Sequence, residues 1–194
     1  MRHALLFCIL LALPGPLGAQ ENQSTPTAQR AGSAAAVLLK AGQVAGADRF
    51  FLGGWAGLVF RDHLVLGGGG MALTQDVELQ GSGSGTGFFL GAGYGGLLFK
   101  YWEDISPYLT GEAGLLLGAG HAEVHDRVAG REVGSENFVV MEPEVSVFYN
   151  LFRQVYLGAS GGYRFAWGIE DLPRVSSGDL QSFTATLSLR VGGS

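Results

Sequence analysis

Along most of the chain, apolar and polar residues alternate with a period of two, which is typical of β-strands that have one apolar face. The clearest case is Ser182–Val191, where the odd positions are apolar and the even positions are serine, threonine or arginine. No segment has the spacing of a convincing amphipathic helix. The alternation therefore predicts a protein built almost entirely from strands.

The pattern predicts eight strands, each about as long as a tilted membrane strand. They are Ala34–Val44, Arg49–Phe60, His63–Val77, Thr86–Lys100, Pro107–Val124, Asn137–Asn150, Gln154–Gly168 and Gln181–Gly192. Apart from the first, their connections alternate between short turns and longer polar loops. We therefore expect an all-β fold, an eight-stranded antiparallel up-and-down transmembrane β-barrel, with its short turns in the periplasm.

The N-terminus has the pattern of a secretory signal peptide at residues 1–19. Arg2 and His3 precede a short apolar core, and small residues precede a cleavage point before Gln20. Residues 20–33 are polar and are predicted to form a flexible N-terminal tail, which leaves residues 34–194 for the barrel. Cys8, the only cysteine, would be removed with the signal. We therefore expect export to the bacterial outer membrane and a mature chain without disulfides.

Composition agrees with a barrel and excludes some partners. The mean hydropathy of +0.24 is high, yet no stretch after the signal has 18 consecutive apolar residues. The 33 glycines disfavour helices, because each interior glycine costs a helix about 1 kcal/mol relative to alanine. The net charge of −5 and the lack of a basic patch argue against nucleic-acid binding.

In the last four strands, every mid-strand charge falls on the face opposite the apolar one. A charge facing lipid at the bilayer midplane would cost about 2–4 kcal/mol, which explains this sorting. The interior of an eight-stranded barrel is filled by side chains, and buried charges need partners. We therefore predict an ion-pair network that plugs the lumen. Its members would be Lys40, Glu112, Glu142, Glu144, Arg164 and Arg190. A proton relay or substrate site made of the same charges remains an alternative.

Aromatic residues gather near the strand ends, as expected of interfacial belts in a membrane barrel. The predicted interfacial residues are Tyr101, Trp102, Tyr108 and Tyr149 around short turns, with Phe165 and Trp167 at the opposite end. Strand-end aromatics also occur in soluble barrels. The aromatic pattern therefore supports the membrane reading without excluding a soluble one.

No motif in the sequence predicts catalysis, a cofactor or a metal. Gly91–Gly96 matches a dinucleotide-binding pattern, but it lies inside a strand and no helix follows. His121 and His125 border a predicted outer loop, where a solvated rim is expected. Ser160 and Ser188 face inward without a histidine on their face. We therefore expect no enzyme activity and no bound cofactor.

The glycine-rich strands GFFLGAGYGGLLFK and VYLGASGGYRFAWG, the signal, the eight segments and the charged interior carry a family resemblance. The chain resembles the small outer-membrane β-barrel family of the OmpA membrane domain and OmpX over residues 34–194. The resemblance implies structural, adhesive or interaction work through the outer loops. The chain departs from the family at its end, LSLRVGGS, which lacks the terminal aromatic read by the barrel-assembly machinery.

The partners expected from this reading are outer-membrane lipid and lipopolysaccharide, the assembly machinery, and a surface ligand for which loops 125–136 and 169–180 are candidates. We expect a monomer, and a solvated role for the two loops. One alternative is a soluble lipocalin-like barrel that binds a small apolar ligand, with Glu142, Glu144, Arg164 and Arg190 turned outward. A second alternative is a barrel-embedded lipid-modifying enzyme.

Overall fold

The computed structural model describes residues 32–79, 87–126, 131–172 and 175–193, and almost all of them lie in β-strands. The elements are β1 (Gly32–Val44), β2 (Ala47–Phe60), β3 (Leu64–Leu73), β4 (Val77–Glu78), β5 (Phe88–Ser106), β6 (Leu109–Asp126), β7 (Arg131–Phe152), β8 (Val155–Trp167), the one-turn helix α1 (Ser177–Leu180) and β9 (Ser182–Gly193). The predicted signal peptide and most of the predicted tail lie outside the described residues. Gly32 and Ser33, expected in the tail, begin β1.

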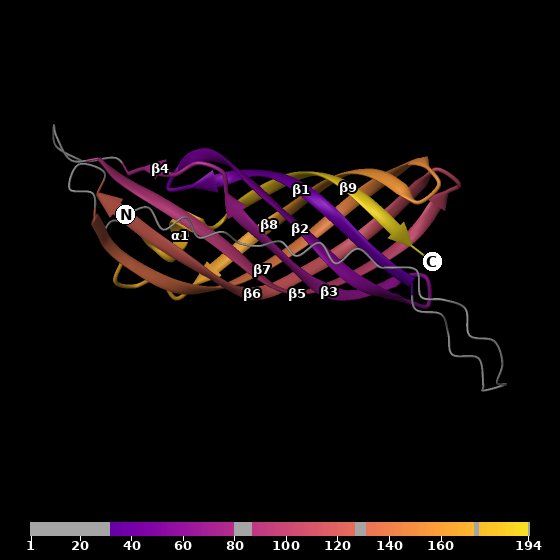
Figure 1. Cartoon of the computed structure of the whole chain (residues 1–194), viewed down its shortest axis with the longest axis horizontal. Helices are drawn as coiled ribbons and strands as arrows, with labels where there is room; N and C mark the ends of the chain where they lie inside the picture. Colours follow the sequence, from indigo (N-terminus) through magenta and orange to yellow (C-terminus); the bar gives the residue numbers. More distant parts are fainter. Residues whose placement is uncertain (1–31, 80–86, 127–130, 173–174, 194) are drawn as a thin grey trace.

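Eight strands form a closed antiparallel ring (Figure 1). Neighbours in the chain pair with each other from β1 to β3 and from β5 to β9, while the β1–β9 and β3–β5 pairings close the ring. The two-residue β4 is an addition that pairs with the start of β5. The predicted eight-stranded antiparallel up-and-down barrel is therefore confirmed.

The two ends of the barrel differ. At one end lie the short turns 61–63, 107–108 and 153–154, the start of β1 and the end of β9; we call it the short-turn end. The opposite end, which we call the long-loop end, carries β4 and α1 (Figure 1). It also carries the tight Ala45–Gly46 turn, where both residues have positive φ (49° and 75°), as in the two-residue turns that suit twisted hairpins.

Strands β5, β6 and β7 are 19, 18 and 22 residues long and continue past the rest of the barrel at the long-loop end. The last β7–β8 pair in this direction is Val139 with Trp167, whereas β7 keeps pairing with β6 as far as Arg131. The predicted loop 125–136 is therefore wrong for all its described residues, which are strand. Polar residues suit a strand there, because a sheet that leaves the apolar zone has water on its surface.

Inward-facing and outward-facing residues of the barrel wall differ sharply in polarity and exposure, most clearly in β9. In β9, Ser182, Thr184, Thr186, Ser188 and Arg190 face the interior and are at most 7% exposed, whereas Phe183 is 82% exposed and Leu187 58%. Even-numbered residues face inward in β1 and in β5–β9, and odd-numbered residues face inward in β2 and β3. The start of β7 is an exception, because a β-bulge opposite Val124 and His125 shifts the register and pairs Arg131 with the inward-facing Asp126. The outer surface of the barrel wall is therefore apolar over the middle of the strands.

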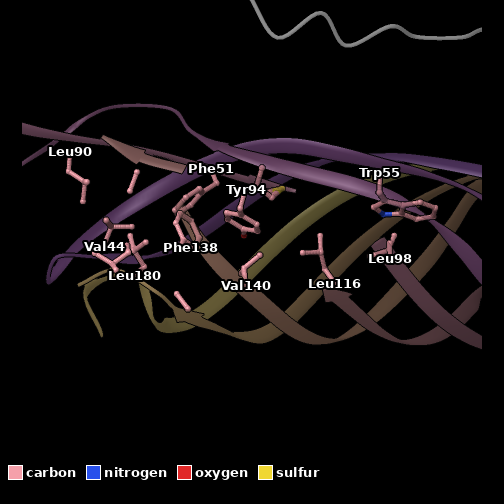
Figure 2. Packing of buried hydrophobic residues seen from close by; sticks show 14 of the residues in the cluster. Val44, Phe51, Trp55, Leu90, Tyr94, Leu98, Leu116, Phe138, Val140 and Leu180 are labelled. Carbon is pink, nitrogen blue, oxygen red and sulfur yellow. The ribbon is translucent and has the colours of Figure 1, made fainter. Parts of the chain in front are cut away.

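The interior also contains an apolar cluster, which the alternation did not predict. At the long-loop end it forms the mouth core, which we define as Val44, Phe51, Leu90, Val124, Phe138 and Val140 (Figure 2). The described residues of 168–181, here called the lid, add Ile169, Leu172, Val175 and Leu180, none more than 6% exposed. The predicted solvated loop 169–180 is thus wrong, because its apolar side chains fold back into the barrel.

Two glycines of β8 allow a matched test of this sidedness. A side chain at Gly158 would overlap the Phe148 ring and crowd Ser188, whereas one at Gly161 would meet nothing within 4 Å. We expect Gly158→Ala to lower the free energy of unfolding by about 1–3 kcal/mol, as overpacking does in a filled interior. Gly161→Ala, on the outer face of the same strand, should leave it within about 0.5 kcal/mol. Urea unfolding of both variants in lipid vesicles measures the difference, and equal effects would contradict the filled interior.

Candidate functional site: the barrel interior

The interior holds a network of buried ion pairs between three cations and three carboxylates. Lys40 Nζ lies 2.7 Å from Glu142 Oε1 and 3.7 Å from Glu144 Oε2. Lys100 Nζ contacts Glu112 and lies 3.7 Å from Glu144 Oε1, while Arg190 Nη1 lies 2.9 Å from Glu112 Oε2. Glu144 thus bridges the two lysines, and Glu112 bridges Lys100 to Arg190. Each cation contacts at least one carboxylate, and the three positive charges match the three negative ones, which offsets much of the cost of burial.

The backbone of β6 leaves space for one of these cations. Gly114 on β6 lies opposite Lys100 on β5. A Cβ at Gly114 would stand 3.2 Å from Lys100 Cγ, so glycine makes room for the lysine to cross the strand toward Glu112. Glycine at this position therefore serves the packing of the network and not a cofactor.

Arg190 is held between aromatic rings as well as by its carboxylate. Its guanidinium carbon lies 4.4 Å from the centroid of Trp102, 4.2 Å from Phe148 and 4.4 Å from Tyr156. Ring faces attract cations, most strongly away from water. The three rings therefore fill the lumen around Arg190 and stabilise its charge.

Lys100 belongs to the network although the sequence analysis did not include it. The sequence predicts a strand that ends at Lys100, with Tyr101 and Trp102 at the following turn. Strand β5 instead continues to Ser106, so that Tyr94, Leu98, Lys100 and Trp102 all face inward. The alternation from Tyr94 to Trp102 was the signal that could have placed it.

Arg164 lies inside the barrel but outside this network. It is 1% exposed, and it forms no ion pair with any carboxylate in the described part of the chain. Its Nε donates to the carbonyl oxygen of Leu180 at 2.6 Å, and its Nη2 donates to that of Gln43 at 2.9 Å. The prediction that Arg164 pairs with the interior acids is corrected, because the strand stagger places it beside backbone carbonyls.

The predicted interfacial aromatics fall into two groups. Tyr101, Tyr108 and Tyr149 are exposed near the short-turn end, and the Tyr108 and Tyr149 rings stack at 6.5 Å. Phe165 and Trp167 stack at 5.8 Å on the outer face toward the long-loop end.

Trp102 is the exception among these aromatics, because it is 6% exposed and faces the lumen. Its Nε1 donates to the carbonyl oxygen of Asp62 at 2.6 Å. The prediction that it is interfacial is wrong, since its even number in β5 points it inward.

The two histidines considered for a metal have different partners. His121 Nδ1 lies 3.0 Å from Asn137 Oδ1, and His125 Nε2 lies 3.1 Å from Glu123 Oε1. In the described ranges, no group of three or more histidine, cysteine or acidic side chains is arranged to hold a metal ion. No helix among the described residues is long and apolar enough to cross a membrane.

A pocket of about 30 Å³ lies in the interior beside Lys40, Lys100, Glu142 and Glu144. This volume accommodates about one or two water molecules. Tyr94 lies near it and donates from its hydroxyl to Glu142 Oε2 at 2.9 Å. The charged interior thus combines direct ion pairs with very little free space.

Comparison with solved structures places this closed ring with a charged interior among known folds. The crystal structure of Neisserial surface protein A superposes with a TM-score of 0.58 at 19% sequence identity, covering 83% of this chain and 96% of that one. The chain has the fold of the small outer-membrane β-barrels. The N-terminal β-barrel domain of Pseudomonas aeruginosa OprF gives a TM-score of 0.50 at 12% identity, covering 84% and 99% of the two chains. No protein-family model and no curated protein sequence matches the chain.

The outer-membrane barrel fold also explains which face is polar. A soluble barrel would turn Glu142, Arg164 and Arg190 toward water, but all three are at most 3% exposed inside the ring. The exposed side chains at mid-strand are instead leucine, valine and phenylalanine. This arrangement argues against the lipocalin-like alternative.

Proposed function

We propose that the protein is an integral barrel of the bacterial outer membrane whose lumen is plugged by ion pairs, with a structural or surface-interaction role and no wide pore. The observation that carries the proposal is the balanced network of three cations and three carboxylates across the lumen. Buried pairs of this kind are costly to break, because removing one partner leaves an uncompensated charge.

The proposed membrane location is supported by the outer surface of the wall. The mid-strand residues that face outward carry no charge in the described part of the chain, and exposed apolar side chains encircle it. Such a continuous apolar surface requires lipid, because soluble monomers rarely expose patches above a few hundred Å². We propose that lipid and lipopolysaccharide surround a monomer delivered by the barrel-assembly machinery, with the long-loop end facing outside.

The proposed surface-interaction role falls on the extension of β6 and β7. Its outward residues include His121, Glu123, His125 and Asn137, none of which is buried. The lid, by contrast, directs its apolar residues into the barrel. A partner that binds the outer surface would therefore contact the β6–β7 extension more than the lid.

Bilayer conductance tests the plugged lumen. We expect the refolded chain without residues 1–19 to give no stable open steps in planar bilayers. The double variant Glu142→Gln/Glu144→Gln, which leaves Lys40 without a carboxylate, should show lower thermal stability and more frequent openings. Glu132→Gln, an exposed change at the long-loop end, serves as the control and should match the unmodified protein.

Two outcomes would contradict the plug. One is a steady large conductance of the unmodified chain that the double substitution leaves unchanged. The other is an unaltered thermal unfolding temperature of the double variant, which would show that the pairs contribute nothing to holding the lumen closed.

A further inference from the structure

Arg164 is a buried cation that forms no ion pair with a carboxylate in the described part of the chain. The network of Lys40, Lys100 and Arg190 with Glu112, Glu142 and Glu144 is balanced, three charges against three. Arg164 adds a fourth cation, 1% exposed, without a described carboxylate beside it. Fully buried charges in proteins are normally paired. The interior holds a fourth carboxylate, Asp126, but Arg164 lacks the direct carboxylate contact that Lys40, Lys100 and Arg190 each have.

The contacts of the Arg164 guanidinium are all with neutral groups. Besides the carbonyls of Leu180 and Gln43, it donates to Ser182 Oγ at 3.3 Å and lies 4.5 Å above the Phe51 ring. Its Nη1 is buried and has no hydrogen-bond partner in the described structure. A guanidinium with a free buried donor is suited to a carboxylate, which it can bind through two parallel hydrogen bonds.

The space next to Arg164 is apolar and is filled by the chain itself. Phe51, Val44 and Leu180 lie on the side toward the long-loop end (Figure 2). Leu172, Val175 and Leu180 enter this mouth core from the lid, and Val77 and Leu79 from the segment at β4 pack in the same cluster.

Few polar bonds hold the lid over the mouth core. The Leu180 carbonyl accepts from Arg164, the Asp179 carbonyl accepts from Ala45 N at 2.8 Å, and Glu136 accepts from the backbone of residues 170 and 171. Gln181 Nε2 also donates to the Ala166 carbonyl of β8 at 3.0 Å. Displacing the lid therefore breaks only a few hydrogen bonds, whereas displacing the walls around it would break the closed sheet.

We propose that the mouth core is a binding site for a single-chain amphiphile with an anionic head group, such as an ionised fatty acid. The head group binds Arg164 in place of the Leu180 carbonyl, and the chain takes the space that Leu172, Val175 and Leu180 occupy. A hydrogen bond to a neutral carbonyl is replaced by an ion pair with a carboxylate, which favours the exchange. Apolar contact with the walls is kept, because one hydrocarbon surface replaces another.

This site goes beyond the proposed structural role and does not open a channel. The ion pairs of Lys40 and Lys100 lie deeper in the barrel than the mouth core and are not touched by the exchange. Binding at the mouth is thus compatible with a plugged lumen. The conductance test of the plug and the labelling test of the binding site therefore have independent outcomes.

Thiol labelling of the lid tests the proposal. Val175→Cys, 6% exposed in the closed lid, is introduced into the chain without residues 1–19, which has no other cysteine. The refolded protein in lipid nanodiscs at alkaline pH is treated with a water-soluble maleimide and with laurate. We expect laurate at about ten times its dissociation constant for the open form to raise the labelling rate about tenfold, because the open population grows as 1 + [L]/Kd while the closed lid predominates. At higher laurate the open form predominates and the rate saturates.

Three controls make the result specific. Dodecanol and dodecyltrimethylammonium, at the same fraction in the bilayer, have the same chain without the anion and should leave the rate unchanged. Ser135→Cys, exposed on β7, reports general effects on labelling and should not respond to laurate. Arg164→Gln in the Val175→Cys background should lose the saturable response whatever its basal rate, and Arg164→Lys should keep part of it.

Folding of each variant is checked by heat-modifiable gel mobility, and Arg164→Lys decides the matter if Arg164→Gln does not fold. Equal responses to all three amphiphiles would overturn the proposal, since they would report a bilayer effect. A flat response to laurate would overturn it as well, and so would a saturable response that persists in Arg164→Gln or is absent from a folded Arg164→Lys.

Discussion

Glu112→Gln should be the most destabilising single change in the barrel interior, lowering the free energy of unfolding by about 3–5 kcal/mol. Glu112 bridges Lys100 and Arg190, and its carboxylate is fully buried (0% exposed side chain). The amide keeps the shape but removes the charge, so two buried cations lose their common counter-ion. Urea unfolding in lipid vesicles, followed by tryptophan fluorescence, measures the loss.

The matched control for this prediction is Glu103→Gln. Glu103 lies on β5 next to Trp102, which is opposite Glu112, but its side chain is 62% exposed and accepts a hydrogen bond from Tyr101. Exposed substitutions of this kind change stability by no more than about 0.5 kcal/mol. Similar losses in the two variants would show that burial of the interior pairs is not what makes Glu112 important.

Leu187→Arg should lower the free energy of unfolding by about 2–4 kcal/mol, although Leu187 is an exposed residue. It is 58% exposed at the middle of β9, opposite Leu39 of β1 and Ala159 of β8. On a soluble protein, an arginine at so open a position would change little. The loss arises because the position faces hydrocarbon, where an arginine cannot be hydrated.

Val133→Arg is the control for this second prediction. Val133 is also exposed and apolar, at 38%, but it lies on the part of β7 that extends beyond the last β7–β8 pair. Water surrounds this extension, so the change in stability should stay within about 0.5 kcal/mol. Equal tolerance of arginine at Leu187 and at Val133, measured by the same unfolding assay, would contradict a lipid-facing wall.

The sequence was sufficient to predict the barrel where alternation was unbroken. From Thr110 to Arg190, each mid-strand charge could be assigned to the interior, because the penalty for a lipid-facing charge leaves one phase for each strand. In glycine-rich β2 and β3 the inward-facing positions could not be predicted in this way, because glycine carries neither an apolar nor a polar side chain and gives no alternation. Their inward residues, such as Phe51 and Trp55, became clear only from the register with β1.

The errors concern features that depend on the assembled barrel. Arg164 was correctly placed on an inward-facing position, but its partners are set by stagger around the ring, which brings it to Gln43 and Ser182. The lid has apolar residues without a strand period, and their burial depends on the shape of the mouth that the strands create. Alternation along one strand carries no information about either feature.

The central claim is that odd-numbered residues of β9 touch hydrocarbon while even-numbered ones face a filled interior. Single cysteines from residue 183 to residue 190, spin-labelled one at a time in lipid vesicles, test it most directly, because dissolved oxygen concentrates in lipid and a nickel chelate remains in water. We expect high collision rates with oxygen at the odd positions and low rates with both reagents at the even positions. High nickel accessibility at Leu187 and Leu189, or the loss of the two-residue period, would contradict it.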